Sequence, residues 1–128
     1  MNLLLDTHVF LWWCDQNSRL GKEASDAIAN PDNTIHVSLA TAWEIAIKEA
    51  LGRLKMPGLV EYAVEKNGFS PLGISFAHAR VAGALPLHHR DPFDRMLIAQ
   101  ARVDQLVFVT HDASIQPYEP YEIDVLWT

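Results

Sequence analysis

Apolar residues recur along the chain with two different periods, and the alternation of these periods predicts strands separated by helices. Continuously apolar runs, such as LLL at 3–5 and VFV at 107–109, are typical of strands buried on both faces. Segments with apolar positions three and four apart, closed by Gly or by Asn-Pro, are typical of amphipathic helices. The predicted strands are 2–5, 34–38, 72–74, 106–110 and 123–127. The predicted helices are 8–14, 21–30, 41–51, 59–67, 76–84 and 92–103.

This order of elements predicts an α/β fold, a three-layer α/β/α sandwich with a central parallel sheet. Strands that are joined through helices need crossover connections, which place the helices on the two faces of the sheet. Residues 1–128 are expected to form a single domain, because this length is near the mode for domains. In such sheets ligands bind beyond the carboxyl ends of the strands, so functional residues are expected there.

Charge and cysteine content narrow the possible functions. Ten Lys and Arg against sixteen Asp and Glu give a formal net charge of −6. A protein that binds nucleic acid by neutralising phosphates should be basic overall, so this chain would need a local basic patch, a metal ion or a basic partner. A lone cysteine, Cys14, excludes an intramolecular disulfide framework and a multi-cysteine zinc site, and suits a reducing cytoplasm. No apolar run of about 18 residues predicts a membrane span.

Four acidic residues from separate segments map to the expected ligand edge. Asp6 and Asp112 follow predicted strands, and Glu44 lies in the helix after the strand that ends at Ser38. Asp94 heads a helix face that is otherwise apolar, continuing through Leu97, Ile98 and Ala101. We expect Glu44 to lie beside a second apolar helix face, formed by Trp43, Ile47, Ala50 and Leu51. A carboxylate among core residues is costly unless something compensates its charge.

Each acid also has a purely structural interpretation. Asp6 and Asp112 could cap the segments that follow them, and Glu44 could pair with Lys48 one helical turn on. Asp91 precedes Pro92 and is typical of a helix cap, while Asp94 would favour the helix dipole. Taken together, however, carboxylates converging at one edge would repel one another by several kcal/mol at about 4 Å and an effective dielectric near 20. A divalent cation removes that conflict, and oxygen ligands select Mg²⁺, or Mn²⁺ in its place, over zinc.

Four segments carry a resemblance that spans nearly the whole chain. LLLDTHVFLW, SLATAWEIAIK, HHRDPFDRMLIAQA and LVFVTHD resemble the PIN domains of VapC-type toxins from type II toxin–antitoxin systems. The resemblance implies a metal-dependent endoribonuclease whose signature acids match Asp6, Glu44, Asp94 and Asp112, with Asp91 as a possible additional acid. Thr7 and Thr110 match hydroxyl residues that flank two of these acids. The resemblance also implies a homodimer and a cognate antitoxin that inserts a segment into the active-site groove.

The resulting hypothesis is hydrolysis of an RNA phosphodiester. Asp6, Glu44, Asp94 and Asp112 would hold Mg²⁺, which polarises the phosphoryl group and activates the attacking water. Thr7 and Thr110 would orient a carboxylate or a metal-bound water. The RNA contacts predicted near these acids are Arg90, Arg95 and Lys48, although a solvated charged face would look the same in the sequence.

The aromatic residues and the cysteine have ordinary interpretations. Trp12, Trp13, Trp43 and Trp127 could stack on bases, but core or dimer packing accounts for them more simply. Cys14 is predicted to be a small core residue, because no base is placed by the sequence to activate it.

Three rival functions remain open at this point. His111-Asp112 also occurs in metal phosphohydrolases of the HD type, but those folds are all helical. A phospho-receiver would need an acid after its third strand, where this chain has Ser75. The third rival is a non-catalytic PIN-like dimer whose acidic groove only docks a basic partner peptide, and an RNA cleavage assay with and without EDTA distinguishes it.

Overall fold

One parallel sheet organises the protein, and the computed structural model describes residues 1–87, 91–121 and 123–128. Its strand order is β3-β2-β1-β4-β5, and all four neighbouring pairs are parallel. The strands are β1 (Asn2–Leu5), β2 (Thr34–Ser38), β3 (Ser70–Leu72), β4 (Val107–Thr110) and β5 (Asp124–Trp127). The helices are α1 (Thr7–Cys14), α2 (Lys22–Ala29), α3 (Leu39–Ala50), α4 (Val60–Lys66), α5 (Phe76–Ala84), α6 (Pro92–Val103) and the 3₁₀ helix η1 (Ala113–Tyr121).

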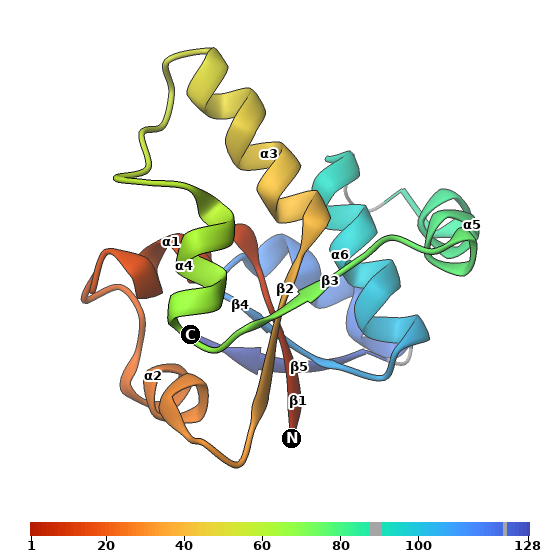
Figure 1. Ribbon diagram of the computed structural model, residues 1–128. Coiled ribbons are helices and arrows are strands. Elements are labelled where there is room, and N and C mark those ends of the chain that lie inside the picture. The colour runs from red at the N-terminus through yellow and green to blue at the C-terminus, as the bar shows by residue number, and fades with distance from the viewer. Residues whose placement is uncertain (88–90, 122) are drawn as a thin grey trace.

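Helices cover both faces of the sheet, which confirms the predicted three-layer sandwich (Figure 1). On one face, Leu3 and Leu5 pack with α1, α2 and α4 through Phe10, Ile28 and Val64. On the other face, a second core cluster joins the sheet to α6 and η1. Alternate residues of β1 supply the two clusters, because successive side chains of a strand point to opposite faces. No helix of the described chain combines the length and the apolarity needed to cross a membrane.

Local capping chemistry fixes where the helices around the site begin and end. Ser38 caps α3, where its Oγ accepts a hydrogen bond from the Ala40 amide at 3.0 Å. Asp91 caps α6, and Pro92 occupies the first helical position, which has no need of an amide donor. Gly52 and Gly68 follow α3 and α4 with a φ of +70°, a conformation that glycine adopts without steric cost.

Several element boundaries differ from the sequence prediction, and three of the differences have a local reason. The cap at Ser38 starts α3 two residues earlier than predicted, at Leu39. Strand β3 covers 70–72 rather than 72–74, and it is an edge strand that tolerates Pro71 in its middle. The segment after Asp112, expected to be only a short turn, continues as η1.

Candidate active site

The acids predicted from the sequence belong to segments that meet at the carboxyl ends of the central strands. Asp6 directly follows β1, and Asp112 lies two residues beyond β4. Glu44 stands on α3, which leaves the carboxyl end of β2, and Asp94 lies in the first turn of α6. β1 lies between β2 and β4 in the sheet, so adjacent strands bring Asp6, Glu44 and Asp112 to the same edge.

Asp6 is buried, with only 4% of its surface exposed. The Thr110 hydroxyl donates a hydrogen bond of 2.7 Å to Asp6 Oδ2 and itself accepts one from the Asp112 amide at 3.1 Å. Burial raises the pKa of Asp6 above its ordinary value, although the Thr110 hydrogen bond and the nearby His8 act in the opposite direction. Thr110 therefore connects two of the acids and orients the carboxylate of one.

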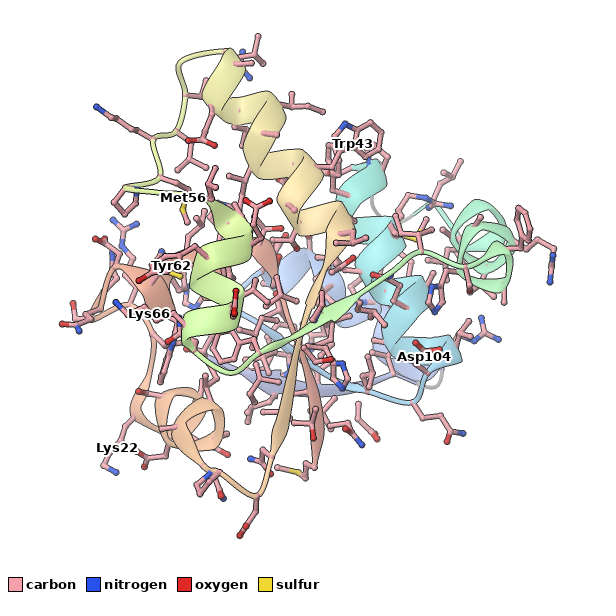
Figure 2. The ribbon with its side chains drawn as sticks, in the orientation of Figure 1. Lys22, Trp43, Met56, Tyr62, Lys66 and Asp104 are labelled. Atoms are coloured by element: carbon pink, nitrogen blue, oxygen red, sulfur yellow. The ribbon has the colours of Figure 1, made fainter. Side chains whose placement is uncertain are left out.

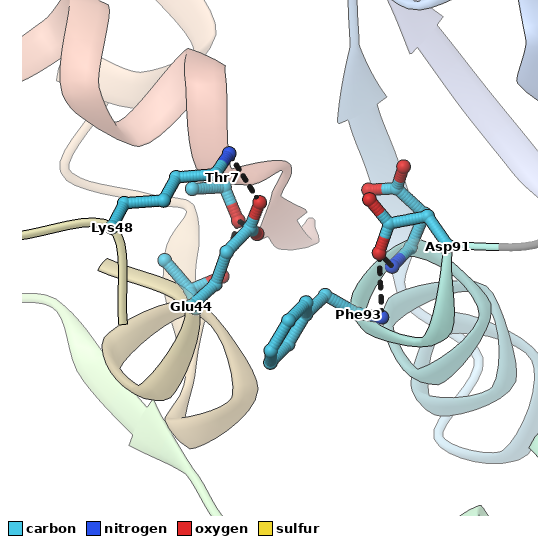
Figure 3. Close-up of polar contacts among 7 residues, drawn as sticks. Thr7, Glu44, Lys48, Asp91 and Phe93 are labelled. Carbon is cyan, nitrogen blue, oxygen red and sulfur yellow. Dashed lines mark hydrogen bonds and ion pairs between the residues drawn. The ribbon is translucent and has the colours of Figure 1, made fainter. Parts of the chain in front are cut away.

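Glu44 is also buried, and two partners hold its carboxylate. Thr7 Oγ1 donates to Glu44 Oε1 at 2.8 Å, and Lys48 Nζ lies 2.7 Å from Oε2 (Figure 3). Thr41 Oγ1 lies 3.1 Å from the Thr7 hydroxyl and extends this chain of contacts. Across the gap in Figure 3, Asp91 and Phe93 mark the start of α6.

The expectation of an apolar core face beside Glu44 is wrong in one respect, because most of that face is exposed rather than buried in the core. Trp43 is 62% exposed and Leu51 is 60% exposed, and Ile47 is exposed as well. The buried side of α3 is instead formed by Ala40, Thr41, Glu44 and Ile45. The polar side chains Thr41 and Glu44 face inward because they line the site, while the apolar stripe faces outward.

Asp94 is an acid of the site whose pKa is raised far above its ordinary value. Burial and the neighbouring carboxylates of Asp6, Asp91, Glu44 and Asp112 raise the pKa of Asp94 to about 8. These four acids therefore lie close enough to Asp94 to act on its charge. Asp91 also serves as a helix cap, since its Oδ1 accepts hydrogen bonds from the amides of Phe93 and Asp94 at 2.8 and 3.4 Å.

Asp112 is fixed by the residue two positions later. Its Oδ1 accepts hydrogen bonds from the Ser114 amide at 3.0 Å and from the Ser114 hydroxyl at 2.7 Å. Asp112 therefore caps the segment that follows it, and it does so through Oδ1. The sequence analysis missed Ser114 and Thr41. Thr41 could have been found, because it lies one helical turn before Glu44 and the two residues therefore share one face of α3.

The three predicted RNA contacts have different outcomes. Lys48 is bound to Glu44, and its side chain is 36% exposed. The Arg95 guanidinium donates to three main-chain carbonyls, those of Ala82, Leu85 and Pro86, at 2.8 to 3.0 Å. It thereby ties α6 to the end of α5, and its contact with RNA stays a prediction. Arg90 lies outside the described residues, as do the neighbouring His88 and His89.

The tryptophans and the cysteine also have separate outcomes. Trp43 lies outside the core and packs edge-to-face on Phe93 at a centroid distance of 5.1 Å. Trp13 packs on Phe69 and donates to Asn67 Oδ1 at 3.0 Å, while Trp12 and Trp127 remain partly exposed. Cys14 packs against the first core cluster, and burial raises the pKa of its thiol, as befits an unreactive core residue.

The donor atoms of the site are of the kind that a hard divalent cation prefers, but those of the described residues are not already arranged as a complete set of ligands. Within the described ranges, no three His, Cys, Asp or Glu side chains already stand as a ready set of metal ligands. The acids near Asp94 nevertheless offer only carboxylate oxygens, which Mg²⁺ and Mn²⁺ prefer. The carboxylates of Asp6, Asp91, Glu44 and Asp112 lie near enough to Asp94 to add to the effect of burial on its pKa, and a bound cation would offset their charge.

Comparisons with known proteins agree with this geometry. A family model described as the PIN domain matches residues 3–118. Ribonuclease VapC22 of Mycobacterium tuberculosis is 30% identical over 129 residues, covering 98% of each chain. Two similar solved structures are VapBC2 from Rickettsia felis bound to a promoter DNA fragment (TM-score 0.69, 14% identity, 98% of both chains) and VapBC-5 from M. tuberculosis (TM-score 0.65, 16% identity, 99% of this chain and 98% of that one).

Proposed function

The chain belongs to the PIN domain family, in its VapC-type branch, and from this premise we propose that it is a Mg²⁺-dependent endoribonuclease acting as the toxin of a type II toxin–antitoxin module. The observation that carries the proposal is that acids from four separate segments gather at one edge of the sheet, where burial and the neighbouring carboxylates raise the pKa of Asp94 to about 8. A fold gains nothing from such mutual repulsion, so the arrangement favours a role that requires a bound cation.

We assign the cation to Asp6, Glu44, Asp94 and Asp112, with Asp91 as an additional acid at the rim. A bound Mg²⁺ would polarise a phosphoryl oxygen and lower the pKa of a water, the usual contributions of this ion to phosphodiester hydrolysis. The chain's own residues prepare the ligands. Thr110 orients the Asp6 carboxylate, and Thr7 and Lys48 hold the two oxygens of Glu44.

The protonation of Asp94 makes the affinity for the cation depend on pH. With a pKa of about 8, the Asp94 carboxyl keeps its proton at neutral pH in the absence of a cation. Cation binding requires the deprotonated form, so Asp94 would release that proton as the ion enters. The expected products are a 5′-phosphate and a 3′-hydroxyl, as the family pattern implies.

The expected partners are RNA, a cognate antitoxin and a second copy of this chain, and the expected compartment is the cytoplasm. An antitoxin is supported by the structural neighbours, which are VapBC toxin–antitoxin complexes. A homodimer is supported by the exposed apolar stripe of α3, since a large apolar surface of this kind is typical of an interface. Sedimentation of the wild type beside Trp43→Glu tests the homodimer.

Purified protein and structured RNA provide the decisive test. Discrete cuts should appear with Mg²⁺, disappear with EDTA and return when Mg²⁺ is restored in excess. Sequencing the cut ends then gives the product chemistry. Cleavage that is unchanged by EDTA would overturn the metal dependence, and no cleavage together with intact binding of a basic peptide would favour the non-catalytic docking function instead.

A further inference from the structure

The Glu44–Lys48 pair on α3 joins an acid of the candidate site to a cation of the same helix. Lys48 Nζ donates a hydrogen bond of 2.7 Å to Glu44 Oε2 across one helical turn. The Glu44 side chain is only 5% exposed, whereas that of Lys48 is 36% exposed. Figure 3 shows the Lys48 ammonium on the α3 side of the gap, across from Asp91. The pair therefore places a positive charge at the rim of a site made of carboxylates.

A second ion pair of the chain shows how the same spacing looks at the surface. Lys22 Nζ lies 2.6 Å from Asp26 Oδ2 on α2, also four residues apart, but these side chains are 87% and 65% exposed. Figure 2 shows Lys22 at the end of the molecule away from Trp43 of α3. Exposed pairs of this kind contribute little to stability, because water screens both charges. Lys48 differs because its partner is buried, and a buried carboxylate is costly without a nearby cation.

Neighbouring hydroxyls fix the acid that binds Lys48. Thr7 Oγ1 donates to Glu44 Oε1 at 2.8 Å and lies 3.1 Å from Thr41 Oγ1, so the carboxylate is fixed from α1 as well as from α3. Oε1 of Glu44 is thus bound to Thr7, and Oε2 is bound to Lys48. The ammonium of a flexible lysine is thereby positioned before a substrate arrives. Such preorganisation avoids the cost of ordering the charged group during the reaction.

Lys48 has more donors than Glu44 uses. An ammonium has three N–H groups, and the hydrogen bond to Glu44 takes one of them. Because the Lys48 side chain is partly exposed, a substrate can reach the others. Arg95 differs, since its guanidinium donates to three main-chain carbonyls. Lys48 is therefore a cation that contacts an acid of the site and is also accessible from outside it.

Hydrolysis of a phosphodiester benefits from positive charge beside the phosphate. A bond forms between a water oxygen and phosphorus, and the bond from phosphorus to the 3′ oxygen breaks, leaving its electron pair on that oxygen. The 3′ oxygen gains a proton, and the attacking water loses one to solvent. The transition state spreads negative charge over the nonbridging oxygens. A donor aimed at these oxygens binds the transition state more tightly than the substrate, so it raises the rate rather than the affinity.

We propose that Lys48 is a catalytic residue that donates a hydrogen bond to a nonbridging oxygen of the cleaved phosphate, and that Glu44 positions it. Lys48 keeps its proton throughout, so it supplies charge and takes no part in proton transfer. This inference rests on the proposed ribonuclease function. It gives Lys48, which the sequence indicated only as an RNA contact, a part in the chemical step.

Neutral variants of Lys48 test this role by two independent measurements. The substrate is a labelled RNA hairpin with an unpaired loop, and single-turnover rates are recorded with Mg²⁺ over a range of protein concentrations. Lys48→Met should lower the maximal rate roughly 100-fold to 1,000-fold, as for one lost donor at a developing oxyanion, with half-saturation nearly unchanged. Electron paramagnetic resonance of Mn²⁺ measures cation binding without RNA. The Mn²⁺ affinity should stay the same or rise, because a positive charge is removed from beside the acids.

Two more variants at this position and one control complete the test. Lys48→Gln loses the charge but can still donate to Glu44, so it replaces Lys48→Met if that variant fails to fold, and it should be equally slow. Lys48→Arg keeps the charge and should cut faster than either neutral variant. Lys22→Met removes the exposed pair on α2 and should change neither the rate nor Mn²⁺ binding. Circular dichroism of each variant verifies the fold.

The possible outcomes distinguish this inference from the proposed function. If the wild type cuts RNA and Lys48→Met cuts it equally fast, only the inference is overturned. A fall in both the rate and the Mn²⁺ affinity would mean that Lys48 merely supports Glu44, which also overturns the catalytic role. A change in half-saturation alone would reduce Lys48 to a simple RNA contact, with the same consequence. If the wild type cuts no RNA, the ribonuclease proposal fails on its own assay.

Discussion

Two regions of this protein place acids beside hydroxyl or imidazole groups, and they differ in the charges that surround those acids. The first region, the acid site, consists of Asp6, Glu44, Asp91, Asp94 and Asp112. The second, the α5–α6 lock, consists of Ser75, His78 and Asp104. In the lock, His78 Nδ1 accepts the Ser75 amide at 3.0 Å, and the Ser75 hydroxyl accepts the His78 amide at 3.1 Å.

The remaining ring nitrogen of His78 completes the lock. Because Nδ1 accepts a hydrogen bond, Nε2 carries the proton of the neutral ring, and it faces Asp104 Oδ1 at 3.1 Å. The lock therefore begins α5 and places its first turn against the end of α6, where an imidazole and a carboxylate lie side by side. In the acid site, by contrast, Asp94 faces four groups of its own kind. An imidazole beside a carboxylate indicates a structural role, whereas several carboxylates beside one another indicate a site that binds a cation.

Removing the carboxylate of Asp94 should have the largest effect. Asp94→Asn should reduce RNA cleavage by at least about a hundredfold, as for other charged groups at a reacting centre. The same change should stabilise the metal-free protein, because it removes a repelled and partly buried carboxylate. Cleavage assays and thermal unfolding in EDTA measure the two effects. Asp124→Asn, which alters an exposed acid on β5, is the control and should change neither.

Thr110→Val tests the orientation of Asp6. The hydroxyl donates to Asp6 and accepts from the Asp112 amide, so its loss affects two acids at once. We expect cleavage to fall roughly tenfold to a hundredfold, as is typical when an outer hydrogen bond to a metal ligand is lost. Thr110→Ser keeps the hydroxyl and should restore most of the activity; an equally inactive Ser variant would mean that the methyl group matters instead.

His78→Ala tests the opposite prediction for the lock. His78 is only 3% exposed, and its removal leaves the Ser75 amide without its partner. The free energy of unfolding should fall by about 1–3 kcal/mol, measured by denaturant titration. Cleavage per folded molecule should stay unchanged. A specific loss of cleavage would give the lock a functional role and remove the contrast between the two regions.

The pH dependence of stability should show the smallest effect. The folded-state pKa values of Asp94 and Asp6 are raised, so the folded protein binds more protons than the unfolded chain from about pH 4 to the Asp94 pKa of about 8. Stability of the metal-free protein should therefore fall as the pH rises through this window. We expect roughly 1–2 kcal/mol from Asp94, since partial exposure screens its charge. Asp94→Asn should flatten the curve, and Mg²⁺ should flatten it at high pH.

Much of the fold could be predicted because its determinants are local. The continuous runs of β1 and β2 and the caps at Ser75 and Asp91 mark element boundaries in the sequence itself. Strand β3 was misplaced because SPL carries no alternation, and its pairing with β2 alone defines it. The orientation of α3 was misjudged because its apolar stripe is as regular as a core stripe, and periodicity does not tell which surface covers it.

The candidate site divides in the same way. The acids stood out because they interrupt apolar patterns or follow strands, features that a single segment contains. The hydrogen bonds of Arg95 to main-chain carbonyls were not predictable, since the three partners come from the end of α5 and the residues that follow it. A groove between α1, α2 and α4 was equally hidden, because these helices contribute to it from separate parts of the sequence.

The sequence by itself determined the alternation of strands and helices, the parallel sheet and the identity of the acids, because short-range patterns of polarity encode each of them. Only the tertiary structure decided the strand order β3-β2-β1-β4-β5, the inward side of α3 and the mutual repulsion at Asp94. These depend on which distant segments come into contact, and burial and electrostatic interaction are properties of that contact rather than of any one segment.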